Sequence, residues 1–149
     1  MIDKLKEMLR RHEAWRNKPY KCSEGKNTIG VGRNFDANPL PPDIKKYLAE
    51  HGEITDEMIV LLLDIDIAAA LKDCRKLYPE FNGFTENRQV ALADFLFNVG
   101  FRTASKFEVT NKAINDGRWD DAAKGLTNSR WFKQVGVRGP EVVKLVKDG

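Results

Sequence analysis

The chain has 149 residues, a length that suits a single domain, and 42% of them are hydrophobic while 32% are charged. This composition excludes a disordered tail, a collagen-like fibre and a membrane-spanning protein, and it predicts a soluble globular protein. The net charge is +3, from 25 Lys and Arg against 22 Asp and Glu, which favours approach to any polyanion but carries no specificity. Two cysteines, Cys22 and Cys74, are too few for a disulfide framework, so we expect both to be free thiols.

The N-terminal part of the chain changes from a helical to a strand-like pattern. Apolar residues at helical spacing predict an amphipathic helix over residues 2–12. Between Pro19 and Phe35, glycines and β-branched residues predict a small antiparallel hairpin or three-stranded sheet. A loop with three prolines, DANPLPPD, follows, and we expect a short helix over residues 43–50 after it.

The rest of the chain has a helical pattern. Thr55 is an N-cap candidate with acidic residues behind it, and it predicts one long helix that ends at Leu77. Thr85 precedes a strongly apolar helix that we expect at the centre of a helical lobe. Beyond it we expect short helical pieces separated by Gly117, Gly125, Gly136 and Gly139-Pro140.

Together these elements predict an α+β fold. We expect one domain over residues 1–149, made of a small N-terminal lobe with a sheet (about 12–58), a long connecting helix (about 55–77) and an all-helical C-terminal lobe (about 78–149) against which helix 2–12 packs. A cleft between the lobes is then the natural place for a site.

Three side chains near the hairpin could together carry chemistry. Glu13 ends the first helix, and the hairpin behind it holds a thiol, Cys22, and a hydroxyl, Thr28. Taken one at a time they are also compatible with a surface acid, a small buried hydrophobe and an ordinary strand residue. Other chemistries fit less well, because the chain has no HExxH metal motif, no complete GxGxxG loop and no third group to orient a His12–Cys22 pair. We therefore expect no metal and no cofactor.

The segment from residue 13 to residue 32, E-AWRNKPYK-C-SEGKN-T-IGVG, resembles the phage-type lysozymes of glycoside hydrolase family 24. The family pattern is a Glu, eight residues, an Asp or Cys, five residues and a Thr, with EGxxTIGxG around the Thr. Further matches follow in order along the chain: ITDEM, ALADFLFNVG, GRWDDAAKGL and NSRWF. The resemblance spans essentially the whole chain, and it implies the lysozyme-like version of the α+β fold predicted above.

The resemblance also implies an activity, the hydrolysis of the β-1,4 bond between N-acetylmuramic acid and N-acetylglucosamine in peptidoglycan. Glu13 matches the general acid, which must stay protonated near neutral pH, and Thr28 matches the residue that holds the attacking water. Cys22 stands where the best-known members have Asp. A thiolate could take the water's proton, whereas a neutral thiol does so poorly, so both an inverting reaction and a covalent route through sulfur stay open, with inversion favoured.

Further residues match positions of the family that bind substrate or support the site. Expected substrate contacts are Asn34, Phe97, Asn98 and Thr110. Expected supporting ion pairs involve Arg138, which matches an Arg that pairs with the catalytic Glu, and Glu24 with Arg130. Arg33 and Asp66 match a buried charged pair with a structural role, and Gly125 stands where another member supplies an Asn. On composition alone Phe97 is equally a core residue, and we expect Trp119, Trp131, Phe107 and Phe132 to belong to the core.

The leading hypothesis is thus a muramidase, a phage or prophage endolysin that acts on peptidoglycan glycan strands as a monomer, with no nucleic acid and no membrane insertion. The first twenty residues contain no apolar run of signal-peptide length. We therefore expect synthesis in the host cytoplasm and holin-dependent release to the cell wall. A non-catalytic peptidoglycan-binding module on the same fold is the alternative, because the usual Asp is absent. A general polyanion binder is a third reading, which steeply salt-dependent DNA binding would support.

Overall fold

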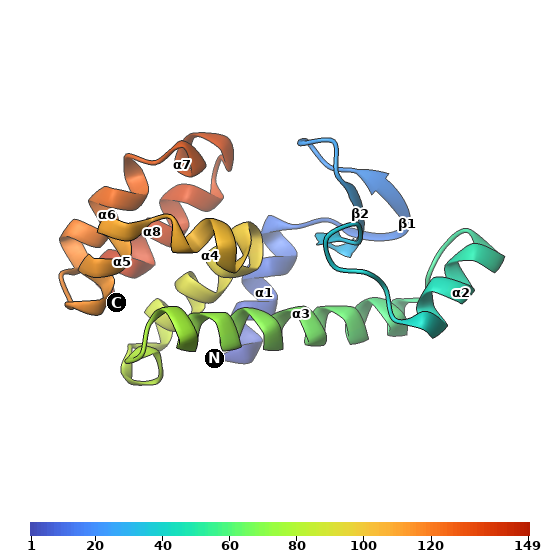
Figure 1. Ribbon diagram of the computed structural model, residues 1–149, viewed down its shortest axis with the longest axis horizontal. Coiled ribbons are helices and arrows are strands. Elements are labelled where there is room, and N and C mark those ends of the chain that lie inside the picture. Colours follow the sequence, from blue (N-terminus) through green and yellow to red (C-terminus); the bar gives the residue numbers. More distant parts are fainter. The chain divides into compact units, whose positions relative to one another are not determined.

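The computed structural model describes all residues from Met1 to Gly149 and shows an α+β protein with one small sheet, as the sequence predicts (Figure 1). The elements are α1 (Ile2–His12), β1 (Trp15–Lys21), β2 (Asn27–Val31), β3 (Arg33–Asn34), α2 (Pro42–His51), α3 (Asp56–Leu77), a short 3-10 turn (Phe81–Gly83), α4 (Glu86–Ser105), α5 (Glu108–Asn115), α6 (Trp119–Thr127), α7 (Arg130–Gln134) and α8 (Arg138–Asp148).

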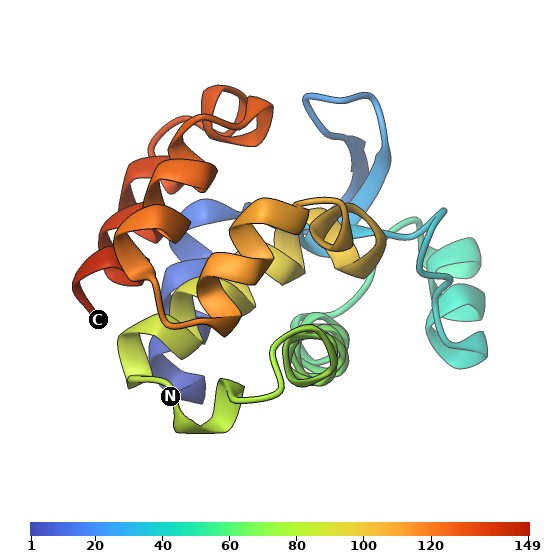
Figure 2. The ribbon, with the colours of Figure 1, turned by 60° about the vertical axis from the view of Figure 1, so that its left-hand side comes forward.

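The chain divides into two compact units. Unit 1 comprises Met1–Met8 and Ala69–Gly149, and unit 2 comprises Leu9–Ala68. Helices α1 and α3 each contribute residues to both units. Figure 2 looks nearly along α3, which is one continuous helix. The sheet thus belongs to unit 2, while α4 to α8 belong to unit 1.

The sheet of unit 2 is antiparallel, with strand order β1-β2-β3. It begins at Trp15, before the predicted start at Pro19. The pairing of β1 with β2 is irregular between Arg16 and Tyr20, and Pro19 lies within this irregular stretch. A proline lacks the N–H of a regular ladder and is tolerated at such a place, which is why the strand continues across it.

Helix α3 begins directly after Thr55, as the sequence predicts, and α2 begins one residue before its predicted start. The backbone N–H of Met58 donates to the side-chain oxygen of Thr55 at 3.1 Å, so Thr55 is the N-cap of α3. Trp15 Nε1 and Asn17 Nδ2 both donate to the carboxylate of Asp56, at 3.2 and 2.9 Å. These bonds fasten β1 to the start of α3. The predicted pair of Arg33 with Asp66 is also present, between β3 and α3.

Unit 1 is built around α4. Its Thr85 N-cap accepts a hydrogen bond from the backbone N–H of Arg88, and the residues from Val90 to Leu96 are all buried, as expected of a central helix. Helix α8 packs against α4, α6 and α7, and α5 packs against α6.

Two expectations about the glycines of this region are wrong. Gly125 lies inside α6, and Gly139 and Pro140 lie in the first turn of α8, so none of them separates helices. A first turn tolerates proline, because its backbone N–H groups have no intrahelical partner. Helix α4 is kinked at Gly100, whose φ is 80°, and a short helical piece follows the kink as far as Ser105.

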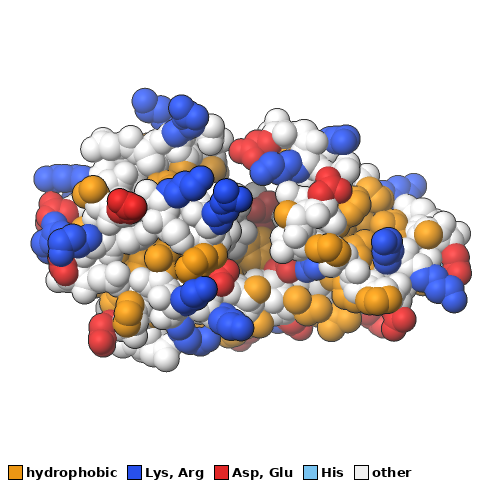
Figure 3. Space-filling model, viewed as in Figure 1, with side chains coloured by type: hydrophobic (Ala, Val, Ile, Leu, Met, Phe, Trp, Pro, Cys, Tyr) orange, Lys and Arg blue, Asp and Glu red, His pale blue; other side chains and the backbone are white.

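The surface is mixed in character. On the face drawn in Figure 3, Lys and Arg side chains lie among Asp and Glu side chains instead of forming one basic patch. No helix is both long enough and apolar enough to cross a bilayer. Among the expected core aromatics, Trp131 is buried, while Trp119, Phe107 and Phe132 are half-buried.

Candidate active site

The turn between β1 and β2 brings Cys22 next to Thr28. The Cys22 N–H donates to the carbonyl of Lys26 at 3.0 Å, and the Gly25 N–H donates to the carbonyl of Cys22 at 2.8 Å. Gly25 has a φ of 76°, which favours glycine. Thr28 is 3% exposed, and its hydroxyl donates to the carbonyl of Lys26 at 2.9 Å.

The surroundings of Cys22 favour its thiolate. Desolvation is the largest single influence and raises the pKa of the thiol, but hydrogen bonds from the backbone of Lys26 and Glu24 and from the Thr28 side chain together lower this pKa below its ordinary value. The Thr28 hydroxyl has one proton, so it bonds the Lys26 carbonyl in one rotor position and the sulfur in another. A lowered pKa raises the fraction of this thiol that is ionised near neutral pH, and only the thiolate can accept a proton.

Glu13 follows α1 and packs against the end of β2. Its backbone N–H donates to the carbonyl of Leu9 at 2.7 Å, and its side chain is half-buried. A Cβ atom added at Gly32 would lie 2.5 Å from Cδ of Glu13, and the φ of Gly32 is 65°. Only glycine meets both conditions, so Gly32 fixes how closely the sheet approaches this carboxyl group.

Tyr20 lies among these groups, although sequence reasoning did not single it out. It pairs directly with Thr28 across β1 and β2, so the two side chains share one face of the sheet. Burial raises the pKa of Tyr20 most, the charge of Glu13 raises it further, Arg16 lowers it, and Cys22 raises it. The phenol therefore lies within electrostatic reach of both Glu13 and Cys22. Its strand position, two residues before Cys22, was the available signal.

The remaining candidates of unit 2 have local partners. The side-chain oxygen of Asn34 accepts from the N–H groups of Asp36 and Ala37, at 3.1 and 3.2 Å, and so shapes the turn after β3. Glu24 is exposed, with its carboxylate 3.6 Å from Nζ of Lys26.

The candidates of unit 1 lie on or beside helices α4, α5, α7 and α8. Phe97 is half-buried, and Asn98 is exposed and accepts a hydrogen bond from Trp131. Thr110 is 5% exposed and packs against Gly125, where any Cβ would collide with the Thr110 hydroxyl. Arg130 is exposed at the start of α7.

Arg138 is buried, and its Nε donates to the carboxylate of Asp94 at 2.9 Å.

The predicted site residues form two sets, one in each unit of the chain. One set lies in unit 2, and its members are Glu13, Cys22, Thr28, Asn34 and Glu24. The other lies in unit 1, and its members are Phe97, Asn98, Thr110, Arg130 and Arg138.

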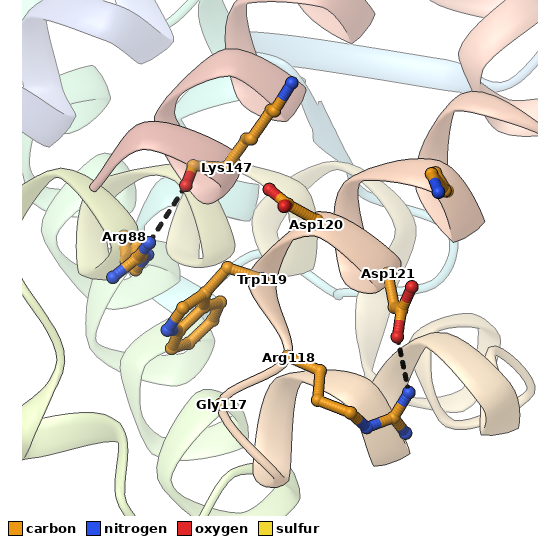
Figure 4. A pocket seen from close by; sticks show the side chains of 8 residues that line it. Arg88, Gly117, Arg118, Trp119, Asp120, Asp121 and Lys147 are labelled. Carbon is orange, nitrogen blue, oxygen red and sulfur yellow. Dashed lines mark hydrogen bonds and ion pairs between the residues drawn. The ribbon is translucent and has the colours of Figure 1, made fainter.

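Unit 1 also has an open cavity of about 610 Å³ that the sequence did not indicate (Figure 4). Its lining residues are Arg88, Gly117, Arg118, Trp119, Asp120, Asp121, Lys124 and Lys147. The guanidinium of Arg88 lies 4.1 Å from the ring centre of Trp119 and donates to the carbonyls of Val146 and Lys147. Arg88 thus holds the end of α8, which is a structural task. No group of three or more His, Cys, Asp and Glu side chains is arranged to hold a metal ion.

A helical unit joined by one long helix to a small sheet, with a thiol and a hydroxyl on the hairpin and the Glu13 carboxyl group packed against Gly32, is compatible with a lysozyme-type glycosidase. The chain belongs to the phage lysozyme family, whose model matches residues 10–147. It is thereby a lysozyme-like peptidoglycan hydrolase.

Individual relatives agree with this assignment. A protein described as "Probable T4-type lysozyme 2" from Dictyostelium discoideum is 29% identical over 164 residues, which cover 100% of this chain and 96% of the relative. A second protein from that organism, "Probable T4-type lysozyme 1", is 27% identical with the same coverage. The "Pre-baseplate central spike protein Gp5" of Enterobacteria phage T4 is 30% identical over 97% of this chain, which matches 28% of the spike protein.

Proposed function

We propose that the protein is a muramidase that hydrolyses the β-1,4 bond between N-acetylmuramic acid and N-acetylglucosamine and acts as a phage or prophage endolysin. The observation that carries the proposal is the hairpin itself, in which the Cys22 N–H and the Thr28 hydroxyl both donate to the carbonyl of Lys26, at 3.0 and 2.9 Å, so that the thiol and the hydroxyl lie close together. Glu13 packs against Gly32 beside the same sheet.

Each group has a role in the proposed reaction. Glu13 protonates the leaving glycosidic oxygen as the bond from that oxygen to the sugar C1 breaks. A water held by Thr28 attacks C1 from the opposite face, and its proton passes to the Cys22 thiolate, so the anomeric configuration is inverted. The hydrogen bonds that lower the pKa of Cys22 support this role, since they increase the fraction of thiolate near neutral pH.

Hydrolysis of purified peptidoglycan tests the proposal, with release of reducing ends followed chemically and product anomers followed by NMR. The Glu13→Gln variant should lose activity by at least about 100-fold, the lower end of the effect of general acid catalysis. Cys22→Asp should retain activity and Cys22→Ser should reduce it. Full activity of Glu13→Gln would refute the assigned acid, and retention of configuration would refute the direct attack by water.

Release of reducing ends, measured together with sedimentation on cell walls, separates a muramidase from a non-catalytic binding module. A non-catalytic binding module would sediment with cell walls without releasing reducing ends from them. For the endolysin role, expression in a bacterial host should cause lysis only when a pore-forming protein opens the inner membrane, because the proposal places the enzyme in the cytoplasm until release.

A further inference from the structure

Helix α3 carries a group of large apolar side chains that face solvent. Six large hydrophobic residues of the chain are exposed, and three of them lie within two turns of this helix: Val60, Leu61 and Ile65, at 44%, 51% and 41% exposure. Ala68, one turn further on, is exposed as well. Single exposed apolar residues are ordinary on a protein surface, but a contiguous group of them marks a contact surface.

The group is part of a longer face with charged ends. A period of 3.6 residues per turn places Glu57, Leu61, Ile65, Ala68 and Lys72 on one face of α3, and all five are exposed. We call these five residues the α3 stripe. At 1.5 Å per residue the stripe is about 22 Å long. Its middle is apolar, an acid stands at its beginning and a base at its end.

This order of charges makes the stripe complementary to itself. Acidic residues occupy the first turn of α3, whereas basic residues occupy its last turn. Two copies with antiparallel α3 helices bring the acidic beginning of each helix against the basic end of the other. Two-fold symmetry then forms the contact of Glu57 with the partner's Lys72 twice. Parallel packing would instead place Glu57 beside the partner's Glu57, so the charges select the antiparallel orientation.

The sizes of the apolar side chains fit the same arrangement. With Glu57 opposite the partner's Lys72, the register places Leu61 opposite the partner's Ala68, so a large side chain meets a small one at both ends of the contact. Ile65 lies near the two-fold axis and meets its own copy there. Such alternation lets two helices interdigitate at the usual axis separation of about 8–10 Å.

The charges around the stripe also disfavour a lipid surface. Glu57 lies at its beginning and Asp64 at its edge. Bacterial membranes of anionic lipid repel such acids and attract clustered Lys and Arg. A second copy of the chain supplies the basic group that Glu57 requires.

We propose that the α3 stripe is the interface of a weak, antiparallel homodimer of this protein. The family resemblance leads to the expectation of a monomer, so the inference goes beyond the proposed function and does not depend on it. One pair of helices is at the small end of specific interfaces, so the dimer forms at high protein concentration.

Sedimentation velocity tests the dimer at protein concentrations from about 0.01 to 1 mM, the range that a weak interface requires. The sedimentation coefficient of the wild type should rise with concentration. Leu61→Ser should raise the Kd of the dimer by at least about tenfold, because symmetry removes two leucine contacts at once. The matched control is Val137→Ser, at a position outside α3 that is 83% exposed, and it should leave the Kd unchanged.

Charge reversal tests the orientation of the two helices. Glu57→Lys and Lys72→Glu should each raise the Kd by about threefold or more, because each replaces two attractive contacts with two repulsive ones. The double variant that carries both changes restores opposite charges in the antiparallel register and should recover the wild-type Kd. Lys46→Glu, an exposed charge reversal on α2, is the control and should have no effect.

Three results would overturn the inference. The first is a wild type that stays monomeric at the highest concentration, and the second is a dimer that Leu61→Ser does not weaken. The third is a double charge variant that dimerises no better than the single ones. A monomer that sediments with phosphatidylglycerol vesicles, and loses this binding in Leu61→Ser, would assign the stripe to lipid and refute the dimer. Thermal unfolding shows that each variant is folded, as expected for exposed positions.

Discussion

Each of the two units buries one pair of an Arg with an Asp, and the two pairs differ in their surroundings. In unit 2, the side chain of Arg33 is 7% exposed and that of Asp66 is 18% exposed. In unit 1, Arg138 is 7% exposed and Asp94 is fully buried. The chemistry is the same, but the charge in unit 1 is farther from water.

The pairs also join different kinds of structure. Arg33 donates to the carbonyls of Asn38 and Pro39 as well, at 3.1 and 2.8 Å, and so fixes the irregular loop that follows β3. Arg138 is the first residue of α8, and its pair with Asp94 joins that helix to the middle of α4, which apolar contacts already pack together. In unit 2 the Arg33–Asp66 pair thus orders a loop that has little apolar packing. In unit 1 the Arg138–Asp94 pair lies within an interface between packed helices.

The largest effect is expected from removing the fully buried acid. Asp94→Ala removes the buried carboxylate that accepts from Nε of Arg138 and should lower the free energy of unfolding by about 3–5 kcal/mol. Urea unfolding at pH 7 measures this. The matched control is the double variant Asp94→Leu with Arg138→Met, which removes both charges and should recover at least half of the loss. If Asp94→Ala lowers the free energy of unfolding by less than about 1 kcal/mol, the buried pair of unit 1 is worth no more than an exposed ion pair, and the two units do not differ as proposed.

A somewhat smaller effect is expected in unit 2, with a characteristic pH dependence. Burial raises the pKa of Asp66 to about 6, although the charge of Arg33 and its hydrogen bond lower it. Because this pKa lies above the unfolded value of 3.8, the protonated carboxyl contributes stability at low pH that is lost as the pH rises through 6. Arg33→Met removes the compensating cation and should cost about 2–4 kcal/mol at pH 7.

The pH dependence of the Arg33→Met variant provides the sharper check. At pH 4 Asp66 is largely protonated in both proteins, so the difference in unfolding free energy should shrink to the loss of the loop hydrogen bonds. Thermal or urea unfolding from pH 4 to pH 8 follows this change. A difference that is constant over the range would mean that Arg33 acts on the loop and not on the carboxylate.

Arg88 allows a third comparison, because this half-buried arginine donates to neutral backbone carbonyls at the end of α8 and not to an acid. Arg88→Met removes the hydrogen bonds to the carbonyls of Val146 and Lys147 and should cost about 1–3 kcal/mol. Faster amide hydrogen exchange in the last turn of α8 would locate the effect. Lys147→Met keeps the accepting carbonyl and should leave exchange unchanged.

The smallest effects should be equal in the two units. Thr55 caps α3 in unit 2 and Thr85 caps α4 in unit 1, with hydrogen bonds of 3.1 and 3.3 Å. Replacement of either by Ala should cost about 1 kcal/mol in urea unfolding. Thr103→Ala, at an exposed position of α4, is the control and should stay within about 0.5 kcal/mol of the wild type. Unequal costs at the two caps would show that the surrounding unit decides the value.

The sequence predicts features that depend on neighbouring residues. The starts of α3 and α4 follow from Thr55 and Thr85, because a cap acts on an N–H three residues ahead. The hairpin with Cys22 and Thr28 follows from its turn residues and from the family resemblance. The fold class is confirmed, since the periodicity of each element is local.

Among features that depend on distant residues, the Arg33–Asp66 pair followed from the family resemblance, but others were missed. The bond between Asn98 and Trp131 joins positions 33 apart in sequence. Gly125 was expected to interrupt a helix, because glycine is a poor helix former, but its place in α6 is explained by the contact with Thr110. Tyr20 was passed over because its neighbours Glu13 and Thr28 converge on it only once the sheet is formed.

The contact between Gly125 and Thr110 has a consequence for how this protein can change. The space beside the Thr110 hydroxyl accepts a side chain from one of the two helices but not from both, since any Cβ at position 125 would overlap that hydroxyl. A side chain at position 125 therefore requires that Thr110 shift or be replaced by a smaller residue. The two positions are therefore coupled, and a substitution at position 125 should cost less stability when residue 110 has already lost its hydroxyl.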